Sequence, residues 1–409
     1  MNKLPKNWSQ GSLCQFFETI TGSTPSKSNN EYYGGSIPFV KPPELLNNYI
    51  HRASDNLSEE GASVARILPP GSILISCIGN LGKIAVNSVP VACNQQINAI
   101  KPNDKAMPAF MFYQVLSPAF NECLHSLASG TTVPIVNKSK FNSISICIPP
   151  LPEQKRIVAI LDEAFAGISL AVANAEKNLA NTRELFESYL NNVFTQKGDG
   201  WVEKKLGDIC SIKHGFAFKS EFFSTAGDYV LLTPGSFHEK GGFRDRGKKT
   251  KYYTGELPTD YILNKGDFLF AMTEQSIGLL GSSMITPESN YYLHNQRLGL
   301  IQINNDVSWD NDFFHHQFNT NYFRAAVQTT ASGLKVRHTS PTKLGAISIA
   351  FPPDVLEQKK IASKLNKIQI EIQNLDTIYQ QKLTALNELK QSILQKAFAG
   401  ELTKGCDNG

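Results

Sequence analysis

The sequence predicts an α+β protein in which two duplicated, strand-rich domains are each followed by a long α-helix, with the two helices pairing as an antiparallel coiled coil. Landmark residues recur in both halves, β-branched runs fill each globular stretch, and two long apolar periodicities run without a proline. A chain of 409 residues is also longer than one hydrophobic core usually supports. The predicted division is 1–150, the helix 151–198, 199–353, the helix 354–402 and a tail, 403–409.

The duplication is indicated by landmarks that keep their order through both halves. They are Trp8, Leu13, Gly22, Asn94-Gln95 and Glu153 in the first half, and Trp201, Leu206, Gly215, Asn295-Gln296 and Glu357 in the second. The offset grows from 193 residues at the tryptophans to 204 at the glutamates, so the second copy carries extra residues spread over loops. A period this long indicates a duplicated domain rather than a solenoid, and chance similarity would not preserve the order.

The globular stretches consist mainly of short β-branched runs bounded by turn residues, the pattern of strands. Predicted strands cover 36–40, 71–76, 83–86, 97–100 and 143–148 in the first copy, and 267–271 and 347–351 in the second. One helix is predicted near 108–127. A short hinge, 197–200, joins the first helix to the second copy.

Each predicted long helix begins after a pair of prolines, which are well tolerated just before or in the first helical turn. Glu153 and Glu357 then fall near a helix N-terminus, where negative charge is favoured. Apolar residues follow at steps of three and four over about five to six heptads, the pattern of a coiled-coil seam. At 1.5 Å per residue, each helix of roughly 45 residues is about 65 Å long.

Composition narrows the class of protein. Hydrophobic residues make up 41% of the chain, no apolar run approaches 18 residues, and the first residues lack the apolar core of a signal peptide. These features predict a cytoplasmic protein that does not contact a membrane. The seven cysteines include no C-x-x-C pair, which favours free thiols over disulfides or zinc. A net charge of +4 requires that any contact with a polyanion come from local patches.

No catalytic or metal constellation is predicted. The adjacent His315-His316 pair belongs to no H-E-x-x-H motif, and Gly79–Lys83 lacks the spacing of a phosphate-binding loop. Asp354, Glu357 and Lys359 have the residue types of a nuclease site, but they share one turn at the start of a helix instead of converging from a sheet. We therefore expect a non-catalytic chain that binds no cofactor of its own.

Polar and basic loops remain as candidate contacts for nucleic acid. Asn, Gln and Arg can form bidentate bonds with base edges, whereas Lys, Ser and Thr suit phosphates. An ordinary solvated surface is the alternative for each residue, and the Asn-Gln pairs have a structural alternative as amide ladders. In the first copy the candidates are Lys27, Asn94, Gln95, Gln96, Thr131, Thr132, Asn137, Lys138 and Lys140. In the second copy they are Lys213, His214, Lys219, Arg244, Arg246, Lys248, Lys249, Lys251, Asn295, Gln296, Arg297, Lys335, Arg337 and His338.

These motifs, in this order, resemble the specificity subunit of a type I restriction–modification enzyme. The resemblance is carried by G-S-T-P-S-K at 22–27, G-F-A-F-K-S at 215–220, the G-D-F-L-F strand at 266–270, S-G-T-T at 129–132 and P-P-L-P-E-Q-K-R-I at 149–157. It covers essentially the whole chain as domain, helix, domain, helix. The second copy departs from the family's Thr/Pro pattern at 334–338. The resemblance names no base-contacting residue.

The resemblance implies that each globular part is a target recognition domain that reads one half of a bipartite site in double-stranded DNA, with the gap set by the helices. It also implies two methyltransferase subunits and, through the complex, restriction subunits as partners; S-adenosylmethionine, ATP and Mg²⁺ would be held by those partners. The assembled complex would be a site-specific deoxyribonuclease and adenine methyltransferase. The competing hypothesis is a coiled-coil scaffold or adaptor without DNA binding.

Apolar residues off the seam form a second face on each predicted helix, and we interpret this face as a docking site for partner helices. Its residues are Leu170, Leu185, Leu190, Phe194, Ile370, Ile378, Leu389, Leu394 and Phe398. The alternative is that they pack on the globular parts of the same chain.

Overall fold

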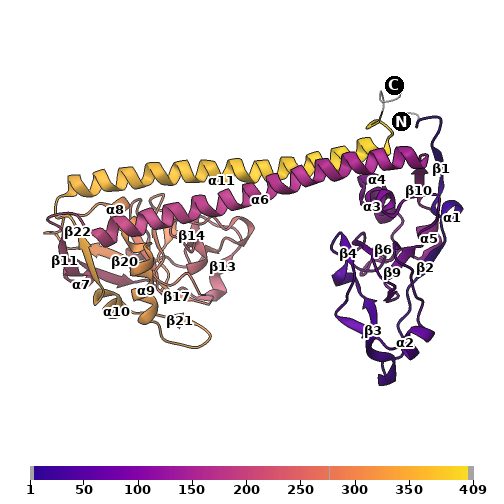
Figure 1. Cartoon of the computed structure of the whole chain (residues 1–409). Helices are drawn as coiled ribbons and strands as arrows, with labels where there is room; N and C mark the ends of the chain where they lie inside the picture. Colours follow the sequence, from indigo (N-terminus) through magenta and orange to yellow (C-terminus); the bar gives the residue numbers. More distant parts are fainter. Residues whose placement is uncertain (1–3, 276, 404–409) are drawn as a thin grey trace. The chain divides into compact units, whose positions relative to one another are not determined.

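The computed structural model describes residues 4–275 and 277–403, which fall into two compact units. Unit 1 comprises the residues up to Glu176 together with those from Gln380 onward, and unit 2 comprises Lys177–Tyr379. Each unit contains one globular part and a segment of both long helices, α6 (Leu151–Gln196) and α11 (Val355–Phe398) (Figure 1). The predicted mixed fold with two long helices is confirmed. Residues 404–409 of the predicted tail, including Cys406, lie outside the described residues.

In its described residues, unit 1 contains three sheets and a group of short helices. The five-stranded sheet has the order β2 (Thr19–Thr21), β9 (Ile97–Ile100), β6 (Ile73–Ser76), β7 (Ile84–Asn87), β4 (Asn48–Ile50). The three-stranded sheet has the order β5 (Asp55–Leu57), β3 (Tyr33–Val40), β8 (Ala92–Cys93), and β1 (Ser9–Ser12) pairs with β10 (Ser145–Ile148). The α-helices before α6 are α1 (Leu13–Phe16), α2 (Glu59–Val64), α3 (Pro108–Leu116), α4 (Pro118–Ser126) and α5 (Lys138–Asn142).

Unit 2 repeats this plan. One four-stranded sheet has the order β12 (Cys210–His214), β20 (Leu298–Ile303), β16 (Phe268–Ala271), β18 (Ser283–Ile285). The other has the order β13 (Phe223–Ser224), β15 (Tyr252–Tyr253), β14 (Tyr229–Leu231), β19 (Tyr292–Leu293). Two further pairs are β11 (Val202–Lys205) with β22 (Ser348–Phe351) and β17 (Thr273–Glu274) with β21 (Arg337–His338). The short α-helices are α7 (Leu206–Ile209), α8 (Asn311–Phe318), α9 (Asn321–Thr329) and α10 (Pro341–Gly345).

The strand registers show that the duplication extends to hydrogen bonding. In unit 1, β6 is antiparallel to both β7 and β9, and in unit 2, β16 is antiparallel to both β18 and β20. The parallel pair β3–β8 has its counterpart in the parallel pair β14–β19. The strand β6 of unit 1 and the strand β16 of unit 2 are therefore equivalent central strands. The loops that follow them occupy equivalent positions in the two units.

The single helix predicted near 108–127 is wrong, because the structure has two helices there. Ser117 ends α3, and its hydroxyl accepts from the backbone N–H of Phe120 at the start of α4. Pro118 has no N–H with which to continue α3, so it occupies the first turn of a new helix instead.

One helix, α6, contains an 18-residue window with a mean hydropathy of 1.6, long and apolar enough by length and composition to cross a membrane. This corrects the expectation that no such run exists. Three apolar residues of α6, Ile157, Leu161 and Ile168, are buried in the protein, and the first two belong to the main core of unit 1. These side chains already have apolar partners within the chain.

A fully buried glutamine ties the start of each long helix to its globular part. In unit 1, Gln154 accepts from the N–H of Met107 (2.9 Å) and donates to the carbonyls of Lys105 (2.9 Å) and Pro149 (2.8 Å). In unit 2, Gln358 makes the corresponding bonds with Asp310 (2.9 Å), Ser308 (3.0 Å) and Pro352 (2.9 Å). The sequence pattern had directed attention to Glu153 and Glu357, whereas the neighbouring glutamines make these bonds.

Within each unit the two long helices run antiparallel. In unit 1, the ammonium of Lys390 lies over the ring of Phe165, whereas the later Phe398 contacts Phe110 and Thr403 donates to Glu153. In unit 2, Lys364 lies over Tyr189, whereas the later Asp376 accepts from Arg183 at 2.6 Å. As α11 advances, its partners move back along α6. The coiled coil itself stays a prediction.

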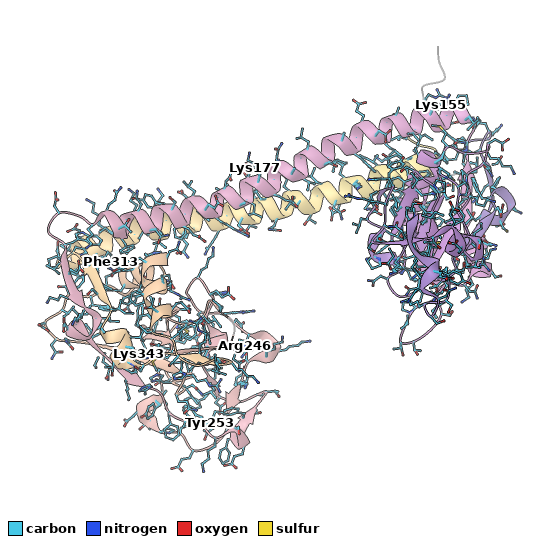
Figure 2. All side chains as sticks on the ribbon, turned by 60° about the horizontal axis from the view of Figure 1, so that its bottom comes forward. Lys155, Lys177, Arg246, Tyr253, Phe313 and Lys343 are labelled. Carbon is cyan, nitrogen blue, oxygen red and sulfur yellow. The ribbon has the colours of Figure 1, made fainter. Side chains whose placement is uncertain are left out.

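The helix segments complete the cores of the globular parts. Leu394 and Ala397 of α11 join the main core of unit 1, and Leu190 and Phe194 of α6 join that of unit 2. Phe194 contacts the ring of Phe313 at 5.2 Å between centroids; Figure 2 shows Phe313 on the side of unit 2 nearest the helices. Each core therefore depends on residues from more than one part of the sequence.

We predict that Gln154→Ala destabilises unit 1 by about 3 kcal/mol or more, because it leaves a backbone N–H and two carbonyls without their partner. Urea unfolding together with hydrogen exchange over residues 101–115 measures this loss. The control is Gln381→Ala, an exposed glutamine on α11 in the same unit, which should change stability by less than about 0.5 kcal/mol. Equal effects of the two substitutions would contradict the role of Gln154.

Candidate nucleic-acid interface

Two loops lie side by side just beyond the central strand of each unit. In unit 1, Cys77 follows β6; its N–H donates to the carbonyl of Gln96 and its carbonyl accepts from Val136, both at 2.8 Å. In unit 2, Met272 follows β16 and makes the same two bonds, with Arg297 and Thr339, both at 3.0 Å. We call these segments the paired loops: 94–96 with 129–136 in unit 1, and 295–297 with 332–339 in unit 2.

The first of the paired loops is a tight turn held by its asparagine. The side-chain oxygen of Asn94 accepts from the N–H of Gln96 at 3.1 Å, and that of Asn295 accepts from the N–H of Arg297 at 3.0 Å. A glycine packs against each turn: a Cβ on Gly22 would lie 2.2 Å from the carbonyl oxygen of Asn94, and one on Gly215 would lie 2.1 Å from that of Asn295. The Gly and Asn-Gln landmarks of the sequence are thus two sides of one contact.

The second of the paired loops is a narrow hairpin with an exposed tip. Bridges between Ser129 and Ile135 in unit 1, and between Ser332 and His338 in unit 2, close its base. The glycine after each serine has a positive φ, 102° at Gly130 and 100° at Gly333. Both tips carry side chains that project into solvent, namely Thr131, Thr132 and Val133 in unit 1 and Leu334, Lys335 and Val336 in unit 2.

Unit 2 carries a further basic segment, 244–251, around the short 3₁₀-helix Gly247–Lys249. Four of its candidates, Arg244, Lys248, Lys249 and Lys251, are exposed. Arg246 is half-buried, with Nη1 3.5 Å from the hydroxyl of Thr233. Beside this segment is a hollow of about 210 Å³, lined by Arg244, Arg246, Lys251, Tyr252 and Tyr291 among others. Cationic side chains beside aromatic rings form a surface that suits phosphates and bases.

Several predicted contact residues are occupied within the protein. Asn295 is buried, and Asn94 holds the equivalent turn. Asn137 caps α5 by accepting from the N–H of Lys140, whose ammonium donates to the carbonyl of Leu127 at 2.9 Å. Arg337 is ion-paired with the buried Glu274, 3.2 Å away. Each of these residues has a structural role within the protein, and its contact with DNA stays a prediction.

The side chains of two further candidates, Lys213 and Gln96, also have contacts within the protein. Lys213 donates to the carbonyl of Asp260 at 2.8 Å and lies 4.5 Å from the centre of the Tyr261 ring. The amide oxygen of Gln96 accepts from Asn94 at 2.9 Å, and Gln96 is half-buried. The candidates that remain exposed are Lys27, Gln95, Thr131, Thr132 and Lys138 in unit 1, and His214, Lys219, Gln296, Arg297, Lys335 and His338 in unit 2, together with the four of the basic segment.

Two buried histidines of unit 2, His294 and His316, have structural roles. His294 is fully buried beside Asn295, its Nε2 lies 3.0 Å from the carbonyl of Leu298, and burial lowers its pKa to about 4. The ring is therefore neutral near pH 7 and adds no positive charge to the paired loops. His316 is likewise buried against Asn366, and burial lowers its pKa as well. Throughout residues 4–275 and 277–403, no three His, Cys, Asp or Glu side chains are grouped to hold a metal ion.

The predicted docking face divides into two groups. Leu190, Phe194 and Leu394 are buried in the cores of the globular parts, and Phe398 packs against the core of unit 1. The docking prediction is wrong for these four residues, because the helices use them to bind their own units. The exposed members are Leu170, Leu185, Ile370, Ile378 and Leu389. Leu375, another apolar residue of α11, is 40% exposed.

Two structural features escaped the sequence analysis. The glutamines at the helix starts recur at equivalent positions in both copies, and that recurrence was the available signal. The second is a cavity of about 590 Å³ in unit 2, lined by Phe186, Leu190, Arg324, Gln328 and Ile372 among others. The residues that line this cavity come from distant parts of the sequence, so no local pattern could predict it.

Comparisons with known proteins agree with this duplicated plan. The family model described as "Type I restriction modification DNA specificity domain" matches residues 5–178 and 198–385. The HindI specificity subunit of Haemophilus influenzae is 36% identical over 198 residues, 46% of this chain and 42% of that subunit. The MjaVIII specificity subunit of Methanocaldococcus jannaschii is 24% identical over 98% of this chain and 94% of that subunit. The chain spans only about half the length of the first relatives that it matches.

Among solved structures, a chain from a type I R-M system, described in terms of its complex assembly and conformational transition, has the same fold. It superposes with a TM-score of 0.80 at 20% identity, covering 98% of this chain and all of that one. The family model accounts for most of the sequence, once in each unit. The chain therefore belongs to the family of type I restriction–modification DNA specificity proteins.

Proposed function

We propose that this chain is the DNA-reading subunit of a type I restriction–modification complex and that each unit reads one half of a bipartite site in double-stranded DNA. The observation that carries the proposal is the recurrence of the paired loops at the same place in both units. Exposed amide, guanidinium and ammonium groups lie on or next to them, at Gln95, Gln296, Arg297 and Lys335. Such groups serve base edges and phosphates, and the presence of paired loops in both units suits two half-sites.

The chain would act through partners. We propose two methyltransferase subunits and, in the full complex, restriction subunits; S-adenosylmethionine, ATP and Mg²⁺ would belong to those subunits, and the complex would work in the cytoplasm. The exposed residues Leu170, Leu185, Ile370, Ile378 and Leu389 are the proposed docking positions for partner helices. A scaffold without DNA binding is not favoured, because the family is defined by a DNA specificity domain.

We predict that Lys335→Ala weakens binding to duplex DNA of any sequence and makes its salt dependence shallower. Each lost phosphate contact lowers the slope of log affinity against log salt by about 0.9. Mobility shifts over a salt series measure the slope. The control is Lys204→Ala, an exposed lysine on β11 outside the paired loops, which should leave the slope unchanged. An unchanged slope for Lys335→Ala would remove this lysine from the interface.

We predict that exchanging residues 1–150 for the first recognition domain of another family member changes one half of the recognised site and leaves the other half unchanged. The reason is that each unit has its own cores and its own paired loops. Sequencing the sites methylated by the assembled complex identifies both halves. The reciprocal control exchanges residues 199–353, and a change in both halves by either chimera would refute the modular reading.

The long helices are the proposed ruler for the gap between half-sites, and lengthening them tests this role. One heptad added to both helices lengthens each by about 10 Å, which corresponds to roughly three base pairs at about 3.4 Å per pair. Three base pairs also rotate the groove by roughly 100°, so distance and groove phase are not both preserved. We expect a gap changed by about one to three base pairs with weaker binding, or loss of specific binding.

Selection of bound duplexes from a library with varied gap lengths and half-sites gives both the gap and the bases read. The bases read in each half-site should stay the same. An unchanged gap at full affinity would mean that the helices do not set the distance.

A further inference from the structure

The hairpin of the paired loops is held differently in the two units. The shared strand register aligns Ile78 with Thr273, since these residues bridge Ile135 and His338, respectively. The next position is Gly79 in unit 1 and Glu274 in unit 2, and its partners across the bridge are Pro134 and Arg337. In unit 1 the link is a backbone bond from the N–H of Gly79 to the carbonyl of Pro134, 2.9 Å long. In unit 2 the backbone pairing is kept, between β17 and β21, and these two positions hold an acidic and a basic residue.

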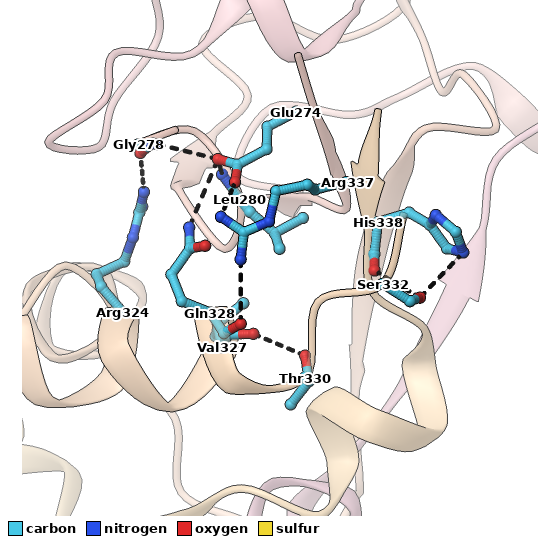
Figure 3. A network of polar contacts seen from close by, with 10 residues as sticks. All are labelled: Glu274, Gly278, Leu280, Arg324, Val327, Gln328, Thr330, Ser332, Arg337 and His338. Atoms are coloured by element: carbon cyan, nitrogen blue, oxygen red, sulfur yellow. Dashed lines mark hydrogen bonds and ion pairs between the residues drawn. The ribbon is translucent and has the colours of Figure 1, made fainter. Parts of the chain in front are cut away.

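The Glu274 carboxylate is the centre of a buried network (Figure 3). Its side chain is 1% exposed. One oxygen accepts from the N–H groups of Gly278 (3.0 Å) and Leu280 (2.9 Å) and lies 3.5 Å from the amide nitrogen of Gln328. The other oxygen lies 3.2 Å from Nη1 of Arg337, as an ion pair without the alignment of a hydrogen bond. The carboxylate thus joins the end of β17, the turn before Leu280 and the hairpin.

Arg337 completes the connection to α9. Its Nη2 donates to the carbonyl of Gln328 at 3.3 Å, near the end of that helix. A second guanidinium, that of Arg324, donates to the carbonyl of Gly278 and contributes positive charge near Glu274. Burial lowers the pKa of Arg324 to about 10, so it stays charged near pH 7. A buried carboxylate is costly unless it is paired, so Glu274 is tolerated here because of these cations.

The difference between Gly79 with Pro134 in unit 1 and Glu274 with Arg337 in unit 2 involves both positions together. Pro134 presets the backbone of the unit 1 hairpin, and Gly79, with a φ of 78°, allows its strand to turn away. Arginine at 337 restricts the backbone far less, and its ion pair with Glu274 adds a side-chain link to the backbone pairing of β17 with β21. Loss of Arg337 alone would leave a buried carboxylate without its hairpin partner, and loss of Glu274 alone would release the arginine.

We propose that Glu274 and Arg337 are a positioning pair that fixes the 332–338 hairpin of unit 2 and thereby sets the stringency with which the second half-site is read. This inference rests on the proposed function. The pair itself lies behind the tip: Leu334, Lys335 and Val336 project from the hairpin that it holds. It is thus a positioning element for the tip side chains rather than a contact to a base.

The chain supplies its own rescue experiment. Glu274→Gly and Arg337→Pro each break the network, whereas the double variant recreates the residues that unit 1 uses at the same places. We expect each single variant to exchange the His338 amide, which donates to Ser332 at 2.9 Å, at least about tenfold faster. The double variant should exchange more slowly than either single variant, although it does not restore the bonds of Glu274 with the N–H groups of Gly278 and Leu280. Exchange in β16 and β20, the core strands of unit 2, controls for global unfolding.

The second readout is site selection by the complex assembled with each full-length variant. Both single variants should accept mismatches in the second half-site about tenfold more readily, with selection at the first half-site unchanged, and the double variant should restore stringency. Faster hairpin exchange without any loss of second-half stringency would overturn the role in reading. A double variant no better than either single one would overturn the pairing.

The two proposals fail separately. A wild-type complex that selects no DNA site would overturn the proposed function and with it the role in reading. The exchange measurements on the same variants would still support or overturn the pairing of Glu274 with Arg337.

Discussion

The fold depends on how a long, mostly exposed helix is anchored at its start. In both units a buried glutamine solves this problem with the same set of three bonds, one accepted and two donated. The backbone before α3 and α8 and the last residues before each long helix would otherwise hold polar groups without partners in the interior. The glutamine therefore fixes the direction of the helix relative to its own globular part.

Around this anchor the two units keep a common scaffold and vary what surrounds it. The central strands, the asparagine turns and the glycines packed against them match closely. Variation appears around the loops: unit 2 adds the exposed basic segment 244–251, and a buried ion pair reaches its hairpin where unit 1 has a proline. Such a division lets a recognition surface change while the hydrogen bonds of the core stay the same.

Much of the fold could be predicted from the sequence, because duplication and helical periodicity are local or repeated signals. The split between α3 and α4 was also readable, since Ser117 can cap a new helix and Pro118 cannot continue the first one. The site was less predictable. Nothing local distinguishes Leu185, which is exposed, from Leu190 on the same helix, which is buried. Likewise, the sequence identifies Arg337 only as a basic loop residue, because its partner Glu274 lies 63 residues earlier in the chain.

The division into units has a consequence for how the protein folds during its synthesis on the ribosome. Unit 2 is one continuous stretch, whereas unit 1 is interrupted by it and needs residues after Gln380. Leu394 and Ala397 are buried in the main core of unit 1, and Thr403 donates to Glu153. Synthesis runs from the N-terminus, so the globular part of unit 1 is made first. Its core is completed only when the end of α11 has been made. A chain truncated just after Tyr379 would therefore lack part of the core of unit 1, although every residue of unit 2 was present.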